Sequence, residues 1–110
     1  MEPIKLLAQN RKARHDYFLL ETFEAGLVLL GSEIKSARAG RVQLRQAYVV
    51  CRGDELWLRN AHIAQYPMAA ARNHDPLRPR KLLLHRRESR QLLRKSSESS
   101  LTIIPTKMYL

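Results

Sequence analysis

The stretch that decides the fold is residues 44–63, LRQAYVVCRGDELWLRNAHI. Residues 44–51 and 55–63 are rich in aliphatic, β-branched and aromatic side chains, which predicts two strands. A Gly-Asp pair at 53–54 lies between them, and glycine at the first turn position is typical of a tight hairpin. The stretch therefore predicts an antiparallel hairpin, in which Cys51 is a small buried residue of the first strand.

On the N-terminal side of this hairpin the sequence predicts one more strand and a short helix. Residues 17–30 read as a strand, with Gly26 allowing a bulge or turn near its middle. Ser32 is a suitable N-cap and Gly40 a suitable C-terminal stop for a helix over residues 32–38.

On the C-terminal side, three prolines predict a loop over residues 65–80, which is followed by a basic helix at 86–95. A last strand is expected at 101–104, where Pro105 indicates an edge or a bulge. Short strands with two small helices predict one domain over residues 1–110, mainly β in class. An OB-like antiparallel β-barrel is one architecture that fits this pattern.

The charge of the chain is unusually positive. Twenty Lys and Arg residues stand against ten Asp and Glu, which gives a net charge of +10. Residues 72–95 alone hold nine basic and two acidic residues. Such a surface attracts polyanions, either nucleic acid or anionic membranes, and we favour nucleic acid over a merely solvated surface.

Several classes of protein are excluded by composition. A single cysteine allows no internal disulfide, which rules out a disulfide-stapled secreted scaffold. No apolar run approaches the roughly 20 residues that span a membrane. Residues 1–12 lack the apolar block of a signal peptide. The simplest interpretation is a reducing, cytoplasmic setting.

Two His-Asp pairs, at 15–16 and 74–75, are the only features that suggest an enzyme. A metal-dependent phosphodiesterase that uses these pairs is a remote alternative. However, one pair opens a predicted strand, the other precedes a proline in a loop, and the remaining histidines fit no ligand spacing. The sequence has no Gly-rich phosphate loop, cysteine cluster or nucleophile elbow. We therefore predict no catalytic residues, no metal, no cofactor and no small-molecule substrate.

Five motifs occur in register along the chain and together are far more specific than any one of them. They are NRKARHDYF at 10–18, ETFEAG at 21–26, GSEIKS with RAG at 31–40, DPLRPRKLLLH at 75–85 and LTIIP at 101–105. In order and spacing they resemble the SmpB family, the SsrA-binding proteins of bacteria. The resemblance runs from about Ile4 to Leu110.

This resemblance implies an OB-like β-barrel with helices packed on it and a non-enzymatic role. It implies binding of the tRNA-like domain of transfer-messenger RNA, which rescues stalled ribosomes by trans-translation. The expected partners are that RNA and the ribosome, with no membrane. A general OB-type RNA or ribosomal RNA binder remains an alternative, and it would bind unstructured RNA equally well.

The sequence departs from the family pattern in four places. Family members continue past Leu110 into further strands and a basic tail associated with the decoding centre, so we expect an incomplete barrel with an unpaired edge near 101–110. Ser89 and Ser96 stand where aliphatic residues are usual, and Ser100 stands at the usual helix-stopping glycine. We expect these serines to make the last helix shorter or more mobile. Ala37 replaces a usual leucine.

The candidate RNA-binding residues combine cations for phosphate with a few groups that can contact bases. Glu24 can accept a hydrogen bond from a base amino group, or it can orient a nearby arginine. Leu83 is either core or an apolar contact for a base, and Tyr17 can stack on one. Arg80 and Lys81, with Leu83, are placed at a loop-to-helix junction suited to phosphate. The full set is Asn10, Arg11, Lys12, Arg14, His15, Tyr17, Glu24, Lys35, Arg38, Arg80, Lys81 and Leu83.

The predicted last helix carries a further group of cations. Arg87, Arg90 and Arg94 recur at helical spacing, so they lie near one another. Like charges this close are mildly destabilising unless an anion is present. This pattern favours a polyanion partner, with ribosomal RNA as one candidate.

Overall fold

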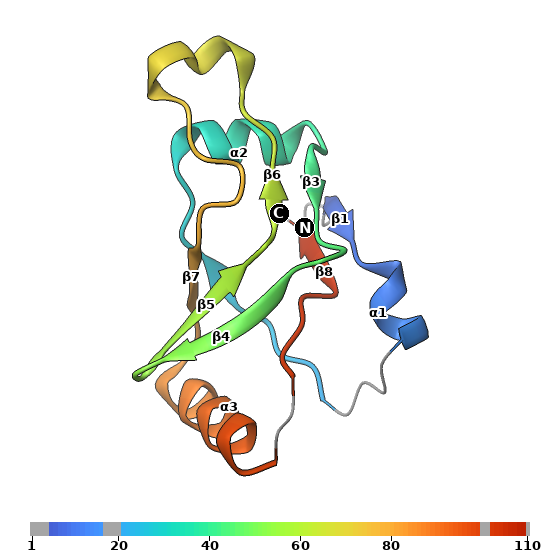
Figure 1. Ribbon diagram of the computed structural model, residues 1–110, viewed down its shortest axis with the longest axis vertical. Helices are drawn as coiled ribbons and strands as arrows, with labels where there is room; N and C mark the ends of the chain where they lie inside the picture. Colours follow the sequence, from blue (N-terminus) through green and yellow to red (C-terminus); the bar gives the residue numbers. More distant parts are fainter. Residues whose placement is uncertain (1–4, 17–20, 100–101, 110) are drawn as a thin grey trace.

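The computed structural model describes residues 5–16, 21–99 and 102–109. Its largest sheet has four antiparallel strands (Figure 1). In spatial order these are β2 (Gly26–Leu27), β7 (Arg80–Leu83), β5 (Glu55–Arg59) and β4 (Tyr48–Arg52).

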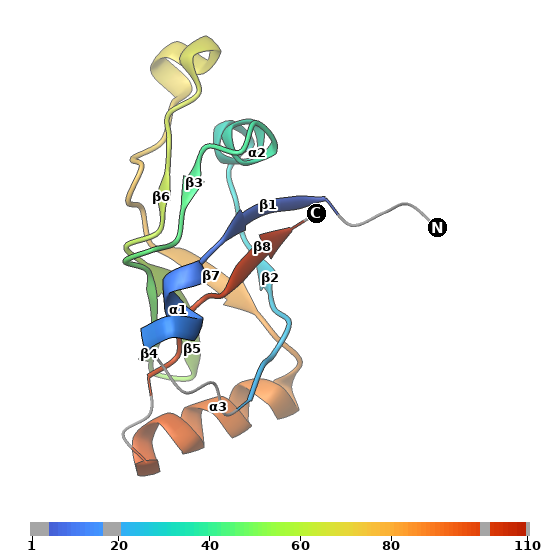
Figure 2. The same ribbon diagram turned by 90° about the vertical axis from the view of Figure 1, so that its right-hand side faces the viewer.

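Two smaller antiparallel pairs and four helical segments complete the described part of the fold. The pairs are β1 (Leu6–Gln9) with β8 (Lys107–Tyr109), and β3 (Val42–Gln43) with β6 (His62–Ile63). The helical segments are α1 (Arg11–Asp16), α2 (Gly31–Arg38), α3 (Arg86–Ser99) and the 3-10 helix η1 (Pro67–Arg72). Along the longest axis α3 lies at one end of the molecule, whereas α2 and η1 lie toward the other (Figures 1 and 2). Antiparallel strands with small helices are the predicted class, but the described strands do not close into a barrel.

The predicted hairpin is confirmed. β4 and β5 pair over five residues each, and Gly53 in the turn has φ +63°, a conformation that glycine adopts without strain. The first strand starts later than predicted, because residues 44–47 form a turn in which the Ala47 N–H donates to the Leu44 carbonyl at 3.0 Å. Cys51 is exposed, so the prediction that it is buried is wrong.

The predicted strand at 55–63 is broken in two. Asn60 has φ +61°, a left-handed conformation that asparagine tolerates better than most residues. β5, which pairs with β4, therefore ends at Arg59. The next strand, β6, pairs with β3 and not with β4.

The predicted α2 forms, but Ser32 is not its N-cap. Leu30 occupies that position, and its backbone N–H donates to Glu33 Oε1 at 2.8 Å. The predicted C-terminal stop is confirmed, since Gly40 has φ +75°. The Gly40 and Arg41 N–H groups donate to carbonyls of the last turn, in the pattern of a Schellman motif.

The segment after residue 65 differs most from the prediction. The loop contains η1, and Arg80–Leu83 form strand β7 rather than a loop-to-helix junction, because β7 pairs with both β2 and β5. α3 extends to Ser99, beyond the predicted end at residue 95, so the serines do not shorten it.

Two further boundary predictions are corrected. Within the predicted strand at 17–30, residues 17–20 lie outside the described part, residues 21–25 have no regular structure, and only Gly26–Leu27 form strand. Of the expected strand at 101–104, residue 101 lies outside the described part, and residues 102–104 form only one bridge, between Ile103 and Val49. The expected open edge is present among the described strands: β8 pairs with β1 on one side, and in this two-stranded sheet no described strand pairs with its other edge.

The buried core lies where β1, β3, β5, β6 and α2 meet. Its members are Leu7, Ala37, Val42, Leu44, Ala47, Leu58, Ala61 and Ile63. Apolar residues of β2, β7 and β8 pack against it only in part, so one side of the core stays accessible. In the described part of the chain, no helix combines the length and hydrophobicity that crossing a membrane requires.

Candidate RNA interface

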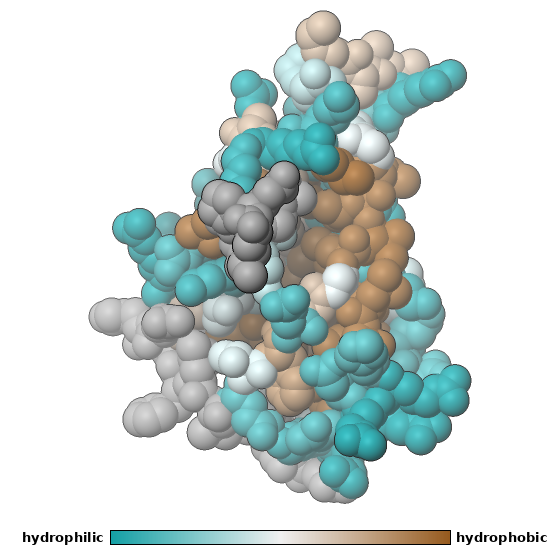
Figure 3. All heavy atoms as spheres, turned by 180° about the vertical axis from the view of Figure 1, so that it is seen from behind, coloured by the Kyte–Doolittle hydropathy of each residue, from teal (hydrophilic) through white to brown (hydrophobic). Residues whose placement is uncertain are grey.

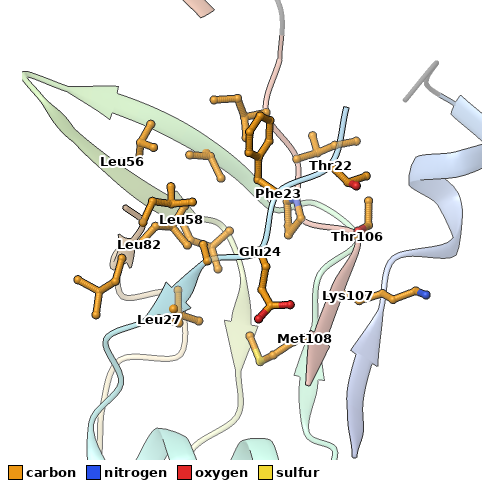
Figure 4. Close-up of a pocket in the computed structure, with 18 of the residues that line it drawn as sticks. Thr22, Phe23, Glu24, Leu27, Leu56, Leu58, Leu82, Thr106, Lys107 and Met108 are labelled. Carbon is orange, nitrogen blue, oxygen red and sulfur yellow. The ribbon is translucent and has the colours of Figure 1, made fainter. Parts of the chain in front are cut away.

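A broad groove of about 1220 Å³ opens on the back of the molecule, the face that Figure 3 shows. Strands β2, β5 and β7 form one wall and β8 lies opposite (Figure 4). Residues of α3 line one end of the groove. The floor is apolar, and its side chains include Leu27, Leu56, Leu58, Leu82, Leu92 and Met108. A groove this wide and open suits a large partner.

Glu24 lies at the rim of this groove, just before β2. It is exposed, and its Oε2 accepts a hydrogen bond from the hydroxyl of Tyr109 on β8. This hydrogen bond, followed by partial desolvation and the negative charge of Glu24, raises the pKa of Tyr109 above its ordinary value. Of the two sequence-based roles for Glu24, orientation of an arginine has no support here, because its hydrogen-bond partner is a tyrosine. Figure 4 shows the Glu24 carboxylate projecting into the groove.

Leu83 lies on the same rim, at the end of β7. The residue is 52% exposed, although its neighbours Leu82 and Leu84 are half-buried. Leu83 pairs with Gly26, where an added Cβ would approach the Leu83 Cβ to 3.3 Å. The small glycine thus lets β2, and with it the preceding segment that carries Glu24, run close beside Leu83. An acceptor and an exposed apolar group, both suited to a base, therefore share one rim.

Arg80, in contrast, is fully enclosed. Its side chain is 0% exposed and its Nε lies 2.5 Å from Glu33 Oε2. The other guanidinium nitrogens donate to the carbonyls of Ala61, at 2.7 Å, and Pro76, at 3.1 Å. The expectation that Arg80 contacts RNA is corrected: it joins β7, α2 and the segments around them.

Glu33 is the centre of this buried network. Arg78 Nη2 lies 2.6 Å from its Oε1, so two arginines share one carboxylate. Burial alone would raise the pKa of Glu33, but the hydrogen bonds from Arg78, the Leu30 N–H and Arg80 outweigh that effect. The pKa of Glu33 is therefore held below its ordinary value, so its carboxyl group is ionised beside the two arginines.

Asn10 is also buried, at 7% exposure, between β1 and α1. Its Nδ2 donates to the carbonyls of Leu44, at 3.2 Å, and Pro105, at 3.1 Å. It thereby joins three distant segments of the chain. Within the described residues its Oδ1 accepts no hydrogen bond, so an RNA contact by Asn10 would use that oxygen.

Replacing Asn10 by alanine is expected to lower the free energy of unfolding by about 2 kcal/mol, because both buried hydrogen bonds are lost and the Pro105 carbonyl loses this donor. Urea unfolding followed by circular dichroism measures the change. Gln9→Ala removes an exposed amide next to it and should cost no more than about 0.5 kcal/mol. Equal losses would show that the tethering hydrogen bonds do not matter.

The other predicted cations are spread over two helices and one strand. Arg11 and Lys12 are exposed on α1. Lys35 and Arg38 are exposed in the last turn of α2, where cations also interact favourably with the helix dipole, and Arg38 lines the groove. Lys81 lies on β7 and forms a half-exposed ion pair with Glu55 at 2.6 Å.

Part of the predicted set lies outside the described residues. Arg14 and His15 belong to α1, but their side chains lie outside the described residues, as does all of Tyr17. The groove therefore brings together Glu24, Arg38 and Leu83 from the predicted set.

The His-Asp pairs give no support for an enzyme. The pair at 15–16 lies outside the described side chains. His74 is buried, with Nδ1 2.8 Å from Ser32 Oγ and Nε2 2.8 Å from the Ile63 carbonyl, so both ring nitrogens are used in structural hydrogen bonds. In the described part of the chain, no three His, Cys, Asp or Glu residues cluster as a metal site would require.

Tyr109 is the rim residue that sequence reasoning missed. Nothing in its local sequence separates it from a strand residue packed in the core. Only the pairing of β8 with β1 carries it across to Glu24, and that long-range pairing has no short sequence signal.

Comparison with known proteins agrees with these features. The family model described as SmpB protein matches residues 7–110. An SsrA-binding protein of Synechococcus elongatus is 54% identical over 108 residues, which cover 97% of this chain and 70% of that relative. An SsrA-binding protein of Symbiobacterium thermophilum is 53% identical over 106 residues, 96% of this chain and 67% of that relative.

A solved structure described as "tmRNA-SmpB: a journey to the center of the bacterial ribosome" has the same fold. It superimposes with a TM-score of 0.76 and 46% identity, covering 99% of this chain and 74% of that one. The resemblance found in the five sequence motifs is thus confirmed along nearly the whole chain, and the chain belongs to the SmpB family.

Proposed function

We propose that this protein binds the tRNA-like domain of transfer-messenger RNA and delivers it to stalled ribosomes for trans-translation. It is an RNA-binding factor, not an enzyme. The observation that carries the proposal is its relationship, at about half identity, to SsrA-binding proteins and to a solved structure of transfer-messenger RNA with SmpB. We place its action in the cytoplasm, where ribosomes translate.

The geometry of the groove supports this function. Phosphate contacts position a protein on RNA, whereas contacts to bases and riboses give preference. The net charge of +10 supplies the first kind. Glu24 and Leu83 on the rim supply the second, since one accepts hydrogen bonds and the other presents an exposed apolar surface.

We propose the following division of roles among the predicted residues. Glu24 and Leu83 contact bases, and Asn10 contributes through its Oδ1. The phosphate contacts come from Arg11, Lys12, Lys35, Arg38 and Lys81, while Arg14, His15 and Tyr17 remain predictions from the sequence.

Titration of the purified chain against the tRNA-like fragment of transfer-messenger RNA tests the proposal. Unstructured RNA of equal length is the control, and both titrations are run at about 50 and about 200 mM salt. We expect at least about tenfold tighter binding to the fragment. Because bound phosphates release counterions, we also expect affinity to fall about tenfold or more over this salt range.

Equal, salt-sensitive binding to both RNAs would overturn the proposal in favour of a general RNA binder. Weak binding that ignores salt would exclude both functions, because neither can avoid phosphate contacts.

A further inference from the structure

The carboxylate of Glu33 anchors the N-terminal end of helix α2. Its Oε1 accepts the N–H of Leu30, the N-cap residue, at 2.8 Å, and lies 2.6 Å from Arg78 Nη2. Its Oε2 lies 2.5 Å from Arg80 Nε. A helix of eight residues is too short to be stable alone, so the placement of α2 depends on contacts of this kind.

The two arginines on this carboxylate differ in exposure. The side chain of Arg80 is 0% exposed, whereas that of Arg78 is 31% exposed. Without Arg78, Glu33 would still accept hydrogen bonds from Arg80 and from the Leu30 N–H. Arg78 is therefore the arginine whose removal leaves the buried carboxylate paired.

Arg78 also joins α2 to the segment that precedes it. Its Nη2 lies 3.5 Å from the carbonyl oxygen of Val28, the residue that follows β2, and its Nε lies 3.4 Å from Glu33 Oε2. The Val28 N–H in turn donates to the Lys81 carbonyl at 3.0 Å, which fixes this segment to β7. Because a guanidinium is planar and holds its donors in a fixed geometry, these contacts set the direction in which α2 leaves β2.

Helix α2 carries two of the cations proposed above to contact phosphate. Lys35 and Arg38 are exposed and three residues apart, so they lie on one side of the helix and move with it. Arg38 also lines the groove. At this end of the helix the Lys5 ammonium donates to the Arg38 carbonyl at 2.9 Å. The direction of α2 thus decides where both cations stand relative to a bound RNA.

We propose that Arg78 is a positioning residue for RNA binding. Its guanidinium bridges Glu33 and the Val28 carbonyl, and it thereby fixes α2 so that Lys35 and Arg38 meet phosphates of the tRNA-like domain. Arg78 acts through α2 and does not itself contact the RNA. The proposal rests on the RNA-binding function above.

The competing role for Arg78 is a direct contact with phosphate, since its side chain is partly exposed and cationic. The two roles differ in how the loss of Arg78 combines with the loss of the α2 cations. An independent contact adds its own effect whether or not Lys35 and Arg38 are present. A positioning residue has little left to contribute once the cations that it positions are gone, and a double-mutant cycle measures this difference.

The cycle consists of the unmodified chain, Arg78→Gln, Lys35→Gln/Arg38→Gln and the triple variant that combines all three changes. The matched control is Arg72→Gln, which removes the same charge from an exposed residue that does not line the groove. Each protein is titrated against the tRNA-like fragment at about 50 and about 200 mM salt. Circular dichroism and thermal melting establish that each variant folds.

Arg78→Gln should bind the fragment about tenfold more weakly than the unmodified chain, and Arg72→Gln about twofold more weakly at most. In the background that lacks Lys35 and Arg38, Arg78→Gln should weaken binding by less than about a further twofold. The slope of log affinity against log salt should fall by about 2 in Arg78→Gln, as for two lost phosphate contacts, although only one charge is removed.

Three results would overturn the proposal. An equal loss with and without Lys35 and Arg38 would make Arg78 a direct contact. No loss in Arg78→Gln, or none in Lys35→Gln/Arg38→Gln, would leave nothing for Arg78 to position. An equal loss in Arg72→Gln would reduce the effect to net charge.

Arg78→Lys keeps the charge but replaces the planar fork by a single ammonium, and it repeats the cycle with the same expected non-additivity if the glutamine variant does not fold. A failure of the RNA-binding function itself appears separately, because the unmodified chain would then show no preference for the fragment over unstructured RNA of equal length.

Discussion

Replacing Glu33 by glutamine is expected to lower the free energy of unfolding by about 3–5 kcal/mol. Glu33 is fully buried and is the only acidic residue in the described part of the chain that forms an ion pair with Arg80, and Arg80 is itself 0% exposed. Glutamine keeps the shape of the side chain but not its charge, so a guanidinium would remain buried without a counter-ion. Urea unfolding followed by circular dichroism measures the loss.

Glu55→Gln is the matched control, because it removes the same charge from an ion pair at the surface. Lys81 and Glu55 lie 2.6 Å apart, but their side chains are 40% and 42% exposed. Exposed pairs contribute about 0–1 kcal/mol, so this variant should unfold nearly as the unmodified chain does. If Glu33→Gln cost no more than Glu55→Gln, the buried network would not be holding α2 to β7.

The unmodified chain and Glu33→Gln should differ in how their stability responds to acid. The surroundings of Glu33 hold its pKa in the folded state below its ordinary value of 4.5. A carboxylate of this kind contributes stability that is fully present above its unfolded pKa and is lost as the pH falls through the lower, folded one. Below about pH 4.5 the unmodified chain should therefore lose stability faster than Glu33→Gln.

Local signals in the sequence predicted local structure well. The Gly-Asp turn at 53–54 and the stop at Gly40 are confirmed, because both depend on backbone conformations that glycine favours over short range. The break at Asn60 was missed, since apolar residues continue on both sides of it and periodicity alone gives no sign of a change in pairing.

Burial of charge was the harder feature to predict. Arg80 stands in the most basic segment of the chain, where a cation looks like part of a solvated or RNA-binding surface. Its partner Glu33 is 47 residues away, and only the packing of α2 against β7 brings the two together. The surface cations of α3 were easier, because helical spacing alone predicts that they share a face.

Replacing Glu24 by alanine is expected to weaken binding to the tRNA-like fragment by about tenfold to a hundredfold, the range for losing a hydrogen bond to a charged group. The side chain is exposed at the groove rim, so the free energy of unfolding should hardly change. Fluorescence titration with the fragment measures affinity, and urea unfolding verifies that the fold is intact. Unchanged affinity would remove Glu24 from the proposed interface.

Tyr109→Phe separates direct contact by Glu24 from an indirect effect, because Glu24 receives its hydrogen bond from the Tyr109 hydroxyl. If Glu24 accepts a hydrogen bond from a base, removing the competing hydroxyl leaves the carboxylate free, and Tyr109→Phe should bind the fragment at least as tightly as the unmodified chain. If Glu24 only fixes the position of Tyr109, the phenylalanine variant should lose as much affinity as Glu24→Ala. We expect the first result, because the exposed carboxylate projects into the groove, whereas the hydroxyl is already engaged in donating to it.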